Sequence, residues 1–432
     1  MWAYLLIILV VVIWLYQRQL AAPIRPRFGD KHIILMAHET SSHGVFTFTP
    51  VATATVYPTI NIAALKQRVM DIVNANPWLV GHLATGYYGT VELQYSTTPK
   101  NAAQAFKHIK APFEANLSWT DQCRYLSYLT DVSSGQNCLD KDIQHFFQVL
   151  CVDLPDGNVA LIMALSHTIG DGYTYYALYK MLDCNQPIVA LNPTRAFYDS
   201  QPAFDQCSPF SRKAFNSPFV LLRIACLGLP YLWHKFTNPD WQIARSVYRI
   251  QLDKVQDIKA NYQPTKKAPF LSTNDILASS FFNATNADIG MFAVNIRSRL
   301  GLGKGYSAGN YICPFAYTSK DFATGANIRE SIQDKDGPHR KVVLDDPIPS
   351  WSRAFSGGRT SLLTNWASFY HDLRLENDVV PLLHTPLSQE SFIPSDADAV
   401  IYYHSANEMR LRARGHVNLP RDVFELLSEG QA

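Results

Sequence analysis

Hydrophobic residues recur along the chain with two different periods, and together these periods predict a mixed α/β protein. Apolar runs rich in β-branched and aromatic residues predict strands at 32–36, 45–49, 52–57, 91–95, 147–154, 159–165, 245–252 and 291–296. Apolar residues spaced three or four positions apart predict helices at 60–74, 173–182 and 272–282.

The clearest local prediction is a β-hairpin followed by a histidine. The turn sequence Pro155-Asp-Gly-Asn158 separates two apolar strands, and His167 comes just after the second. A neutral imidazole at a strand-loop-helix junction can take a proton from a hydroxyl, an amine or a thiol. Asp171 can orient the ring, brace the loop or simply cap the following helix, and these possibilities remain open.

The N-terminus is an uncharged apolar run that predicts a membrane anchor. As a helix, residues 1–17 span about 26 Å, slightly less than the roughly 30 Å hydrocarbon core of a bilayer. The alternative is a cleaved signal peptide, but no basic segment precedes the run. The body of the protein is expected in the cytosol because three arginines follow the run, namely Arg18, Arg25 and Arg27.

A proline-rich stretch at 192–242 predicts a crossover between two domains. Within it, residues 219–233 are apolar except for Arg223 and have basic residues on both sides. This segment fits either a buried crossover helix or a second membrane contact. Arg223 and Pro230 argue against a complete membrane span.

Length, charge and cysteine content narrow the class of protein. A chain of 432 residues predicts two or three domains. The net charge is only +2 and no long basic run occurs, which argues against nucleic acid as a partner. The seven cysteines include no C-x-x-C pair, so a reduced protein facing the cytosol is favoured over one with disulfides or structural zinc.

Four short motifs follow one another along the chain. The first is His167-Thr-Ile-Gly-Asp-Gly172, an H-x-x-x-D-G sequence. The others are the helix beginning at 272, the stretch 294–299 ending in N-x-R-x-R and followed by Gly309-Asn310, and the segment 363–369 containing Thr-x-Trp. In kind and order they resemble the CoA-dependent acyltransferase superfamily of chloramphenicol acetyltransferase, the BAHD acyltransferases, wax ester synthases and condensation domains.

The resemblance implies an α/β fold of two chloramphenicol acetyltransferase-like subdomains. Each is expected to be a mixed sheet flanked by helices, with an active-site tunnel between them that acyl-CoA and the acceptor enter from opposite faces. No permanently bound cofactor and no metal is implied, and acyl-CoA is the co-substrate. The expected parts are an N-terminal transmembrane helix and flank at 1–22, an N-terminal subdomain at 23–195, a crossover at 196–243 and a C-terminal subdomain at 244–432.

The resemblance also implies roles for the residues of the first and third motifs. His167 is the implied general base, which takes the acceptor proton as the acceptor attacks the thioester. Asp171, Gly172 and Arg297 are implied to support the site, with Asp171 pairing with Arg297 to hold the loop that bears His167. The alternative for Arg297 is a surface residue at a strand end.

The fourth motif is implied to contact the reacting carbonyl. Thr364 and Trp366 are expected near the tetrahedral intermediate, with the Thr364 hydroxyl as an oxyanion donor. Thr364 also fits an ordinary strand threonine, and Trp366 fits a buried core residue. The residues that bind CoA stay unknown, and three loop lysines are candidates for contacting its phosphates: Lys266, Lys267 and Lys304.

Two departures from the family pattern concern the subfamily. Ser166 stands where many relatives have a first histidine, but the second, catalytic histidine is present as His167. The D-F-G-W-G motif of plant BAHD enzymes is absent after Phe369, where the chain continues Tyr370-His-Asp. Because that motif is structural in its family, its absence bears on the subfamily more than on the reaction.

The sequence therefore predicts a membrane-anchored, acyl-CoA-dependent O-acyltransferase. The expected partners are acyl-CoA, the membrane and a lipophilic acceptor such as a fatty alcohol, a sterol or a diacylglycerol, with an amine as a less favoured acceptor. A non-catalytic lipid-binding or membrane-tethering protein that retains the fold is the alternative. Metal-dependent hydrolysis with His167 and Asp171 as ligands lacks support from any further cluster at ligand spacing.

Overall fold

A computed structural model describes most of the chain after the predicted membrane anchor. The expected anchor at 1–22 and Lys304 lie outside the described residues, so both expectations stay predictions. The described residues are 28–41, 45–86, 90–141, 144–238, 243–302, 306–332, 347–389, 395–415 and 417–430.

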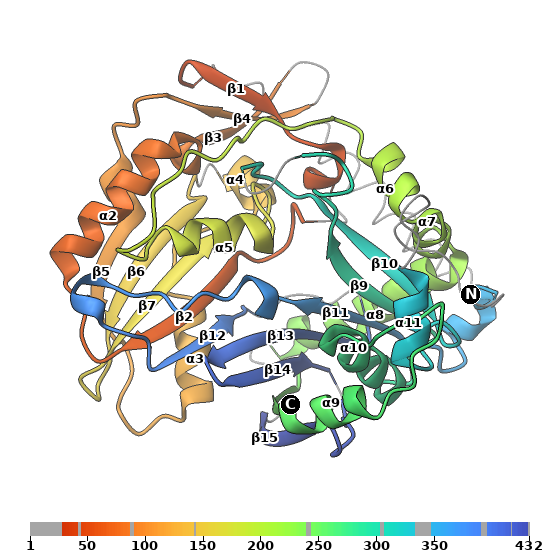
Figure 1. Cartoon of the computed structure of the whole chain (residues 1–432). Helices are drawn as coiled ribbons and strands as arrows, with labels where there is room; N and C mark the ends of the chain where they lie inside the picture. Colours follow the sequence, from red (N-terminus) through yellow and green to blue (C-terminus); the bar gives the residue numbers. More distant parts are fainter. Residues whose placement is uncertain are drawn as a thin grey trace. The chain divides into compact units, whose positions relative to one another are not determined.

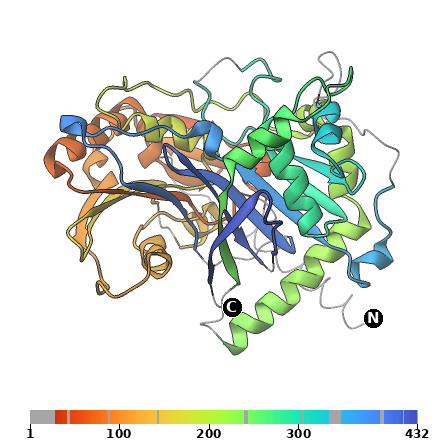
Figure 2. The ribbon, with the colours of Figure 1, turned by 60° about the horizontal axis from the view of Figure 1, so that its bottom comes forward.

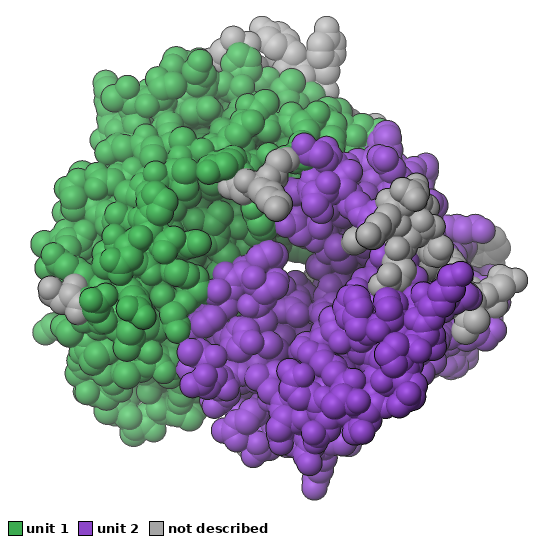
Figure 3. Space-filling view, viewed as in Figure 1, with its two compact units in different colours: residues 1–200, 302–311, 371–389 green, residues 201–301, 312–370, 390–432 purple. Residues whose placement is uncertain are grey.

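The chain forms two compact units, and each unit takes segments from distant parts of the sequence (Figure 3). Unit 1 consists of residues 1–200, 302–311 and 371–389, and unit 2 of residues 201–301, 312–370 and 390–432. The sequence predicted two subdomains, each formed by one continuous stretch of the chain. The two compact units do not show which parts of the chain fold independently, so this division stays a prediction.

Unit 1 is built on a five-stranded sheet with the order β12-β2-β7-β6-β5 (Figure 1). Neighbouring strands are antiparallel except for β5 and β6, which are parallel. A smaller antiparallel sheet has the order β1-β4-β3. The strands are β1 Lys31–Ile34, β2 Val51–Tyr57, β3 His82–Thr85, β4 Val91–Tyr95, β5 Phe106–Lys110, β6 Phe147–Asp153, β7 Val159–Leu165 and β12 Leu383–Leu387.

The predicted hairpin is confirmed. Strands β6 and β7 pair antiparallel from Phe147 opposite Leu165 to Asp153 opposite Val159. Gly157 closes the turn at φ +87°, a conformation that glycine adopts without steric cost. The strand predicted at 45–49 is wrong, because these residues form a turn in which the apolar side chains of Val45 and Phe46 are buried.

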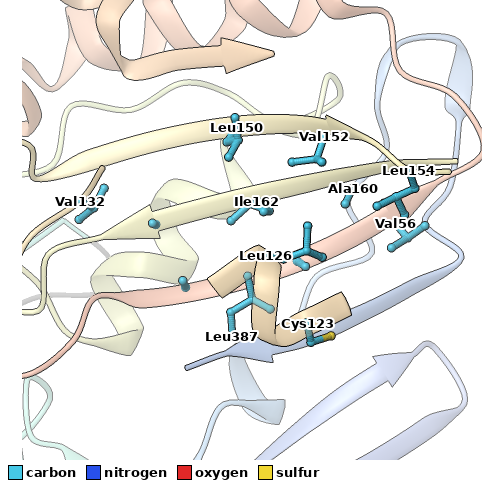
Figure 4. Close-up of a cluster of buried hydrophobic side chains, with 13 residues drawn as sticks. Val56, Cys123, Leu126, Val132, Leu150, Val152, Leu154, Ala160, Ile162 and Leu387 are labelled. Atoms are coloured by element: carbon cyan, nitrogen blue, oxygen red, sulfur yellow. The ribbon is translucent and has the colours of Figure 1, made fainter. Parts of the chain in front are cut away.

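Helices cover both faces of the larger sheet. On one face, Cys123 and Leu126 of α3 pack against alternate residues of β2, β6 and β7, such as Val56 and Ile162 (Figure 4). On the other face, Tyr175 of α5 donates its hydroxyl hydrogen to Met163 O at 3.0 Å. The helices of unit 1 are α2 Ile62–Ala75, α3 Trp119–Ser127, α4 Gly135–Lys141 and α5 Gly172–Lys180.

Unit 2 is built on a seven-stranded sheet with the order β10-β9-β11-β13-β14-β8-β15. Strand β11 runs parallel to both of its neighbours, and the other pairs are antiparallel. The strands are β8 Arg245–Ile250, β9 Ile289–Asn295, β10 Ile312–Thr318, β11 Thr360–Asn365, β13 Ala397–Ser405, β14 Glu408–Arg414 and β15 Phe424–Gly430.

The helix predicted from residue 272 is confirmed as α10, Thr273–Ala284. Ser272 caps it by accepting a hydrogen bond from Asp275 N at 3.2 Å, and the Asp275 carboxylate accepts one from Ser272 N at 2.7 Å. This reciprocal capping box explains why the helix begins where the sequence indicates. Shorter helices α9 Leu252–Ala260 and α11 Gly325–Ser331 belong to the same unit.

The proline-rich stretch forms three helices of unit 2, namely α6 Gln201–Cys207, α7 Pro209–Phe215 and α8 Pro218–Thr237. Among the described residues, α8 is the one helix that is long and apolar enough to cross a membrane, although these properties alone are weak evidence. Only 11% of the most apolar 18-residue stretch of α8 is buried. The structure thus excludes the interpretation of α8 as a fully buried helix, and Figure 2 shows its end extending beyond the strands of unit 2.

Candidate active site

His167 stands between a buried strand and a capped helix, both in unit 1. Strand β7 ends at Leu165, and α5 begins at Gly172, directly after its cap residue Asp171. Asp171 Oδ1 accepts hydrogen bonds from Thr174 N at 2.9 Å and Thr174 Oγ1 at 3.1 Å. The capping interpretation of Asp171 is therefore confirmed. The short loop between two anchored elements restricts where the His167 ring lies.

The side chain of Asn310 holds the backbone and the ring of the histidine loop. Its Nδ2 atom donates to the backbone oxygens of His167 at 2.8 Å and Thr168 at 3.3 Å, and to Glu39 Oε1 at 3.0 Å. Its Oδ1 atom lies 3.1 Å from His167 Nδ1. Because all the Nδ2 partners are acceptors, the opposite amide orientation would place oxygen against oxygen, so the assignment of Oδ1 toward the ring is determined.

This contact determines which ring nitrogen of His167 carries the proton. An amide oxygen only accepts hydrogen bonds, so His167 Nδ1 must be the donor to Asn310. In a neutral imidazole the other nitrogen, Nε2, then keeps its lone pair. Asn310 thereby prepares Nε2 of His167 to act as a base.

A buried ion pair holds Asn310 in turn. The carboxylate of Glu39 is fully buried and accepts a hydrogen bond from Arg195 Nε at 2.8 Å. Its other oxygen accepts from Asn310 N at 2.9 Å as well as from the Asn310 side chain. One carboxylate therefore binds Asn310 through both its backbone and its side chain.

Arg195 connects three segments of unit 1. Besides Glu39, its guanidinium donates to the backbone oxygens of Ile169 at 3.2 Å and Ala308 at 3.2 Å. Gly309 lies against it with φ +129°, and a Cβ atom there would lie 2.9 Å from Arg195 Cζ. Glycine at 309 thus permits both the backbone conformation and the close approach of the guanidinium.

His38 supports the same segment from another side. Its Nε2 lies 2.8 Å from Asn310 O, and its Nδ1 lies 2.8 Å from Ser200 Oγ. Because a carbonyl oxygen only accepts, Nε2 of His38 donates and Nδ1 accepts from Ser200. Burial lowers the pKa of His38, which favours this neutral form.

The electrostatic environment matches the roles assigned by hydrogen bonding. Burial lowers the pKa of His167, although hydrogen bonds and the Asp171 carboxylate oppose the shift, so the imidazole is neutral at pH 7. Burial raises the pKa of Glu39, but the charge and hydrogen bond of Arg195, with smaller contributions from His38 and the Met36 backbone, bring the net pKa below its usual value. The site therefore holds a neutral histidine and an ionised glutamate.

The predicted pairing of Asp171 with Arg297 stays a prediction, because the two residues belong to different units. Within unit 1, Asp171 Oδ2 accepts a hydrogen bond from Tyr311 N at 3.1 Å. Within unit 2, Arg297 follows the end of β9, and its Nη1 donates to Asn295 Oδ1 at 3.2 Å. Arg297 is 3% exposed, and its supporting role stays a prediction.

Thr364 and Trp366 mark the end of β11 in unit 2, so their contact with a reacting carbonyl also stays a prediction. Both side chains are partly exposed, which distinguishes Trp366 from a fully buried core residue. The backbone N–H of Trp366 donates to Ile401 O at 2.8 Å. Of the candidate lysines, Lys267 pairs with Glu330 at 2.9 Å on the surface.

Ser166, the residue that departs from the family pattern, is buried beside the base. Its Oγ atom has no hydrogen-bond partner within the described part of the chain. A buried polar atom without a hydrogen bond typically lowers the stability of the folded protein by about 1 to 3 kcal/mol.

Among the described residues, no cluster of three or more histidines, cysteines or acidic residues has the geometry of a metal site.

The sequence did not identify Glu39 and Arg195 as residues of the site. It included Asn310 in a motif but predicted no role for it. Glu39 and Asn310 are separated by 271 residues, so no local pattern connects them. One signal was present, since Gly309-Asn310 belongs to a motif that resembles the acyltransferase family. The fold is needed to show that Asn310 contacts His167.

Replacing Glu39 with glutamine is expected to destabilise unit 1 strongly. The substitution keeps the shape of the side chain but leaves the Arg195 guanidinium, which is 2% exposed, without a counter-charge. Removing one partner of a buried ion pair typically costs about 3 to 5 kcal/mol. Urea unfolding of E39Q should show this loss at neutral pH. The difference from wild type should shrink once acid protonates Glu39, because a carboxyl with a lowered pKa stabilises only while ionised.

The matched control is Glu425→Gln, which removes the same charge from an exposed pair. Arg249 Nη1 and Glu425 Oε2 are 2.8 Å apart, but the side chains are 41% and 48% exposed. Exposed pairs contribute less than about 1 kcal/mol. Equal, small losses for E39Q and E425Q would contradict a structural role for the Glu39–Arg195 pair.

Solved structures with a similar fold include TRI101, a polyketide synthase associated protein and condensation domains. TRI101 of F. graminearum, complexed with coenzyme A and deoxynivalenol, is 12% identical, with a TM-score of 0.56 over 89% of this chain and 94% of that chain. Polyketide synthase associated protein 5 from Mycobacterium tuberculosis is 14% identical, with a TM-score of 0.53 over 90% and 94%. The condensation domain of the Monacolin K polyketide synthase MokA is 11% identical, with a TM-score of 0.51 over 92% and 93%.

No protein-family model and no curated protein sequence matches the chain. At 11 to 14% identity, the structural likeness establishes the fold and leaves the activity to be argued from the site. The fold expected from the resemblance in the motifs is confirmed at that level: the chain has a mixed α/β fold with two sheet-rich parts, similar to that of TRI101 and the condensation domain.

Proposed function

We propose that the protein is an acyl-CoA-dependent O-acyltransferase with His167 as its general base. The observation that carries the proposal is the contact of Asn310 Oδ1 with His167 Nδ1, which leaves Nε2 unprotonated. The lowered pKa of His167 keeps the ring neutral at pH 7, as a base must be before it acts.

The proposed reaction is the transfer of an acyl group from sulfur to oxygen. The acceptor hydroxyl gives its proton to Nε2 of His167 while its oxygen attacks the thioester carbonyl and forms a tetrahedral intermediate. Collapse of the intermediate breaks the carbon–sulfur bond, and the CoA sulfur leaves with the proton from Nε2. The Thr364 hydroxyl is proposed to stabilise the oxyanion, with Trp366 beside it, and the Asp171–Arg297 pair to hold the loop.

The solved neighbours support acyl-CoA as the donor and a small molecule as the acceptor. TRI101 was crystallised with coenzyme A together with deoxynivalenol or T-2 mycotoxin. The starter condensation domain of rhizomide synthetase was crystallised with C8-CoA and Leu-SNAC. For this chain, we propose a lipophilic acceptor, because the apolar run at 1–17 fits a membrane anchor with the body of the protein in the cytosol.

A screen for acyl transfer tests this proposal. The full chain is incubated with acyl-CoAs of different lengths and with fatty alcohols, sterols, diacylglycerols and amines, and free CoA and the acylated product are measured. The wild type should form an ester, and His167→Ala should lower kcat/KM by about 10²- to 10⁴-fold, the usual contribution of a general base.

The matched control is His108→Ala, which removes a surface histidine of β5 whose Nε2 lies 2.8 Å from Asp153 Oδ1. It should retain wild-type activity. Full activity of His167→Ala would contradict the proposal. Folded wild-type protein that transfers no acyl group from any CoA thioester would favour the non-catalytic, lipid-binding alternative.

The pH dependence of the reaction should reflect the lowered pKa of His167. The base works only when neutral, and it is neutral above its pKa, so activity should persist below pH 6.5, the ordinary value for histidine. The expected result is an acidic limb of kcat/KM with its midpoint below pH 6.5. A midpoint at or above pH 6.5 would contradict the assignment of His167 as a desolvated base.

A further inference from the structure

The last two turns of α8 expose large apolar side chains. Leu232, Trp233 and Phe236 are 60%, 65% and 82% exposed within the described structure. Single exposed apolar residues are ordinary on a protein surface, but three within five positions of one helix form a patch. Tryptophan and phenylalanine are also the side chains that enter the interface of a lipid bilayer.

The beginning of α8 is held firmly against unit 2. Phe219 and Val220 are buried in a cluster with residues of β9 and β10, such as Met291. Arg223 forms an ion pair with Asp396 and donates to Ala354 O at 3.3 Å. The position of the exposed end of α8 is therefore fixed by the contacts that its first turns make with unit 2.

Geometry limits how the exposed end can meet a membrane. The stretch from Pro230 to Thr237 is about 12 Å of helix, against a hydrocarbon core of roughly 30 Å. Because Phe219 and Val220 in the first turn are buried in unit 2, the whole helix cannot cross the bilayer. Its end can only enter the interface.

The charges in the sequence around α8 favour binding to a membrane that contains anionic lipid. The sequence contains no aspartate or glutamate from 206 to 239, whereas the same stretch contains Arg212, Lys213, Arg223 and Lys235. Arg212 pairs with Asp205 and Arg223 with Asp396, so their charges are partly balanced. Lys213 is exposed but lies on α7, before the buried start of α8, whereas Lys235 lies in the last turn of α8, beside the apolar patch. Basic residues near an apolar face are attracted to anionic headgroups.

We propose that the end of α8 docks on an anionic membrane surface, with Leu232, Trp233 and Phe236 inserted among the headgroups. This contact is separate from the predicted anchor at 1–17, and together they would give the protein two attachments to one bilayer. An anchored chain keeps the end of α8 close to the bilayer, so the second contact becomes intramolecular. The proposal does not depend on the acyl-transfer reaction.

A fluorescent reporter on α8 tests the proposal in the full chain. An environment-sensitive fluorophore is attached at Phe236→Cys after Cys184 and Cys226, the cysteines that are not buried, are replaced by serine. The protein is mixed with phosphatidylcholine vesicles with or without phosphatidylserine, some carrying spin-labelled lipid. Leu426→Cys, on β15 and 46% exposed, provides a control position for the same label.

The expected result is a blue shift of the label at 236, and its quenching by spin-labelled lipid, on vesicles that contain phosphatidylserine. The label at 426 should not respond. Replacing Leu232 and Trp233 with serine should weaken the vesicle affinity reported by the label at 236 about tenfold or more, because two apolar side chains no longer enter the bilayer interface. The matched pair Val380→Ser and Leu382→Ser, at exposed positions of unit 1, should leave it unchanged.

Several results would overturn the proposal. One is an unshifted label at 236 on protein bound to anionic vesicles, and another is a failure of the full chain to bind them. A label that is blue-shifted without lipid and insensitive to spin-labelled lipid would show that the N-terminal segment covers α8. A shift that grows with protein concentration in the absence of lipid would show that a second copy covers it.

Discussion

The buried ion pair between Glu39 and Arg195 is the interaction on which the candidate site depends. Two buried charges are stable only when each is paired and fully hydrogen-bonded, and here each forms several such bonds. Glu39 positions Asn310, and Arg195 holds the loop that carries His167 through the backbone oxygen of Ile169. The chemical state of His167 thus depends on residues that do not touch its ring.

The sequence predicted the parts of the site that depend on local chemistry. The hairpin β6–β7, the position of His167 after it and the cap at Asp171 follow from alternation, turn residues and capping propensity. The start of α10 at Ser272 follows from a capping box in the same way. All of these depend on neighbours within a few residues, which is why one sequence was enough.

What the sequence did not predict depends on contacts between distant segments. Arg195 and Glu39 are 156 residues apart, and His167 and Asn310 are 143 residues apart. Residues 45–49 were predicted to form a strand because their apolar pattern indicates burial. A turn whose apolar side chains are buried has the same pattern, and these residues form such a turn. Likewise, composition could not decide whether α8 is buried, whereas its surroundings in unit 2 show that its end is exposed.

The most direct test of the account is the protonation state of the His167 ring nitrogens, measured by side-chain ¹⁵N NMR at neutral pH. The His167 signals are assigned by their loss in His167→Gln. The structure predicts a protonated Nδ1 and an unprotonated Nε2, because Asn310 Oδ1 accepts a hydrogen bond from Nδ1. A proton on Nε2 alone, or on both nitrogens, would contradict the claim that Asn310 prepares His167 as a base.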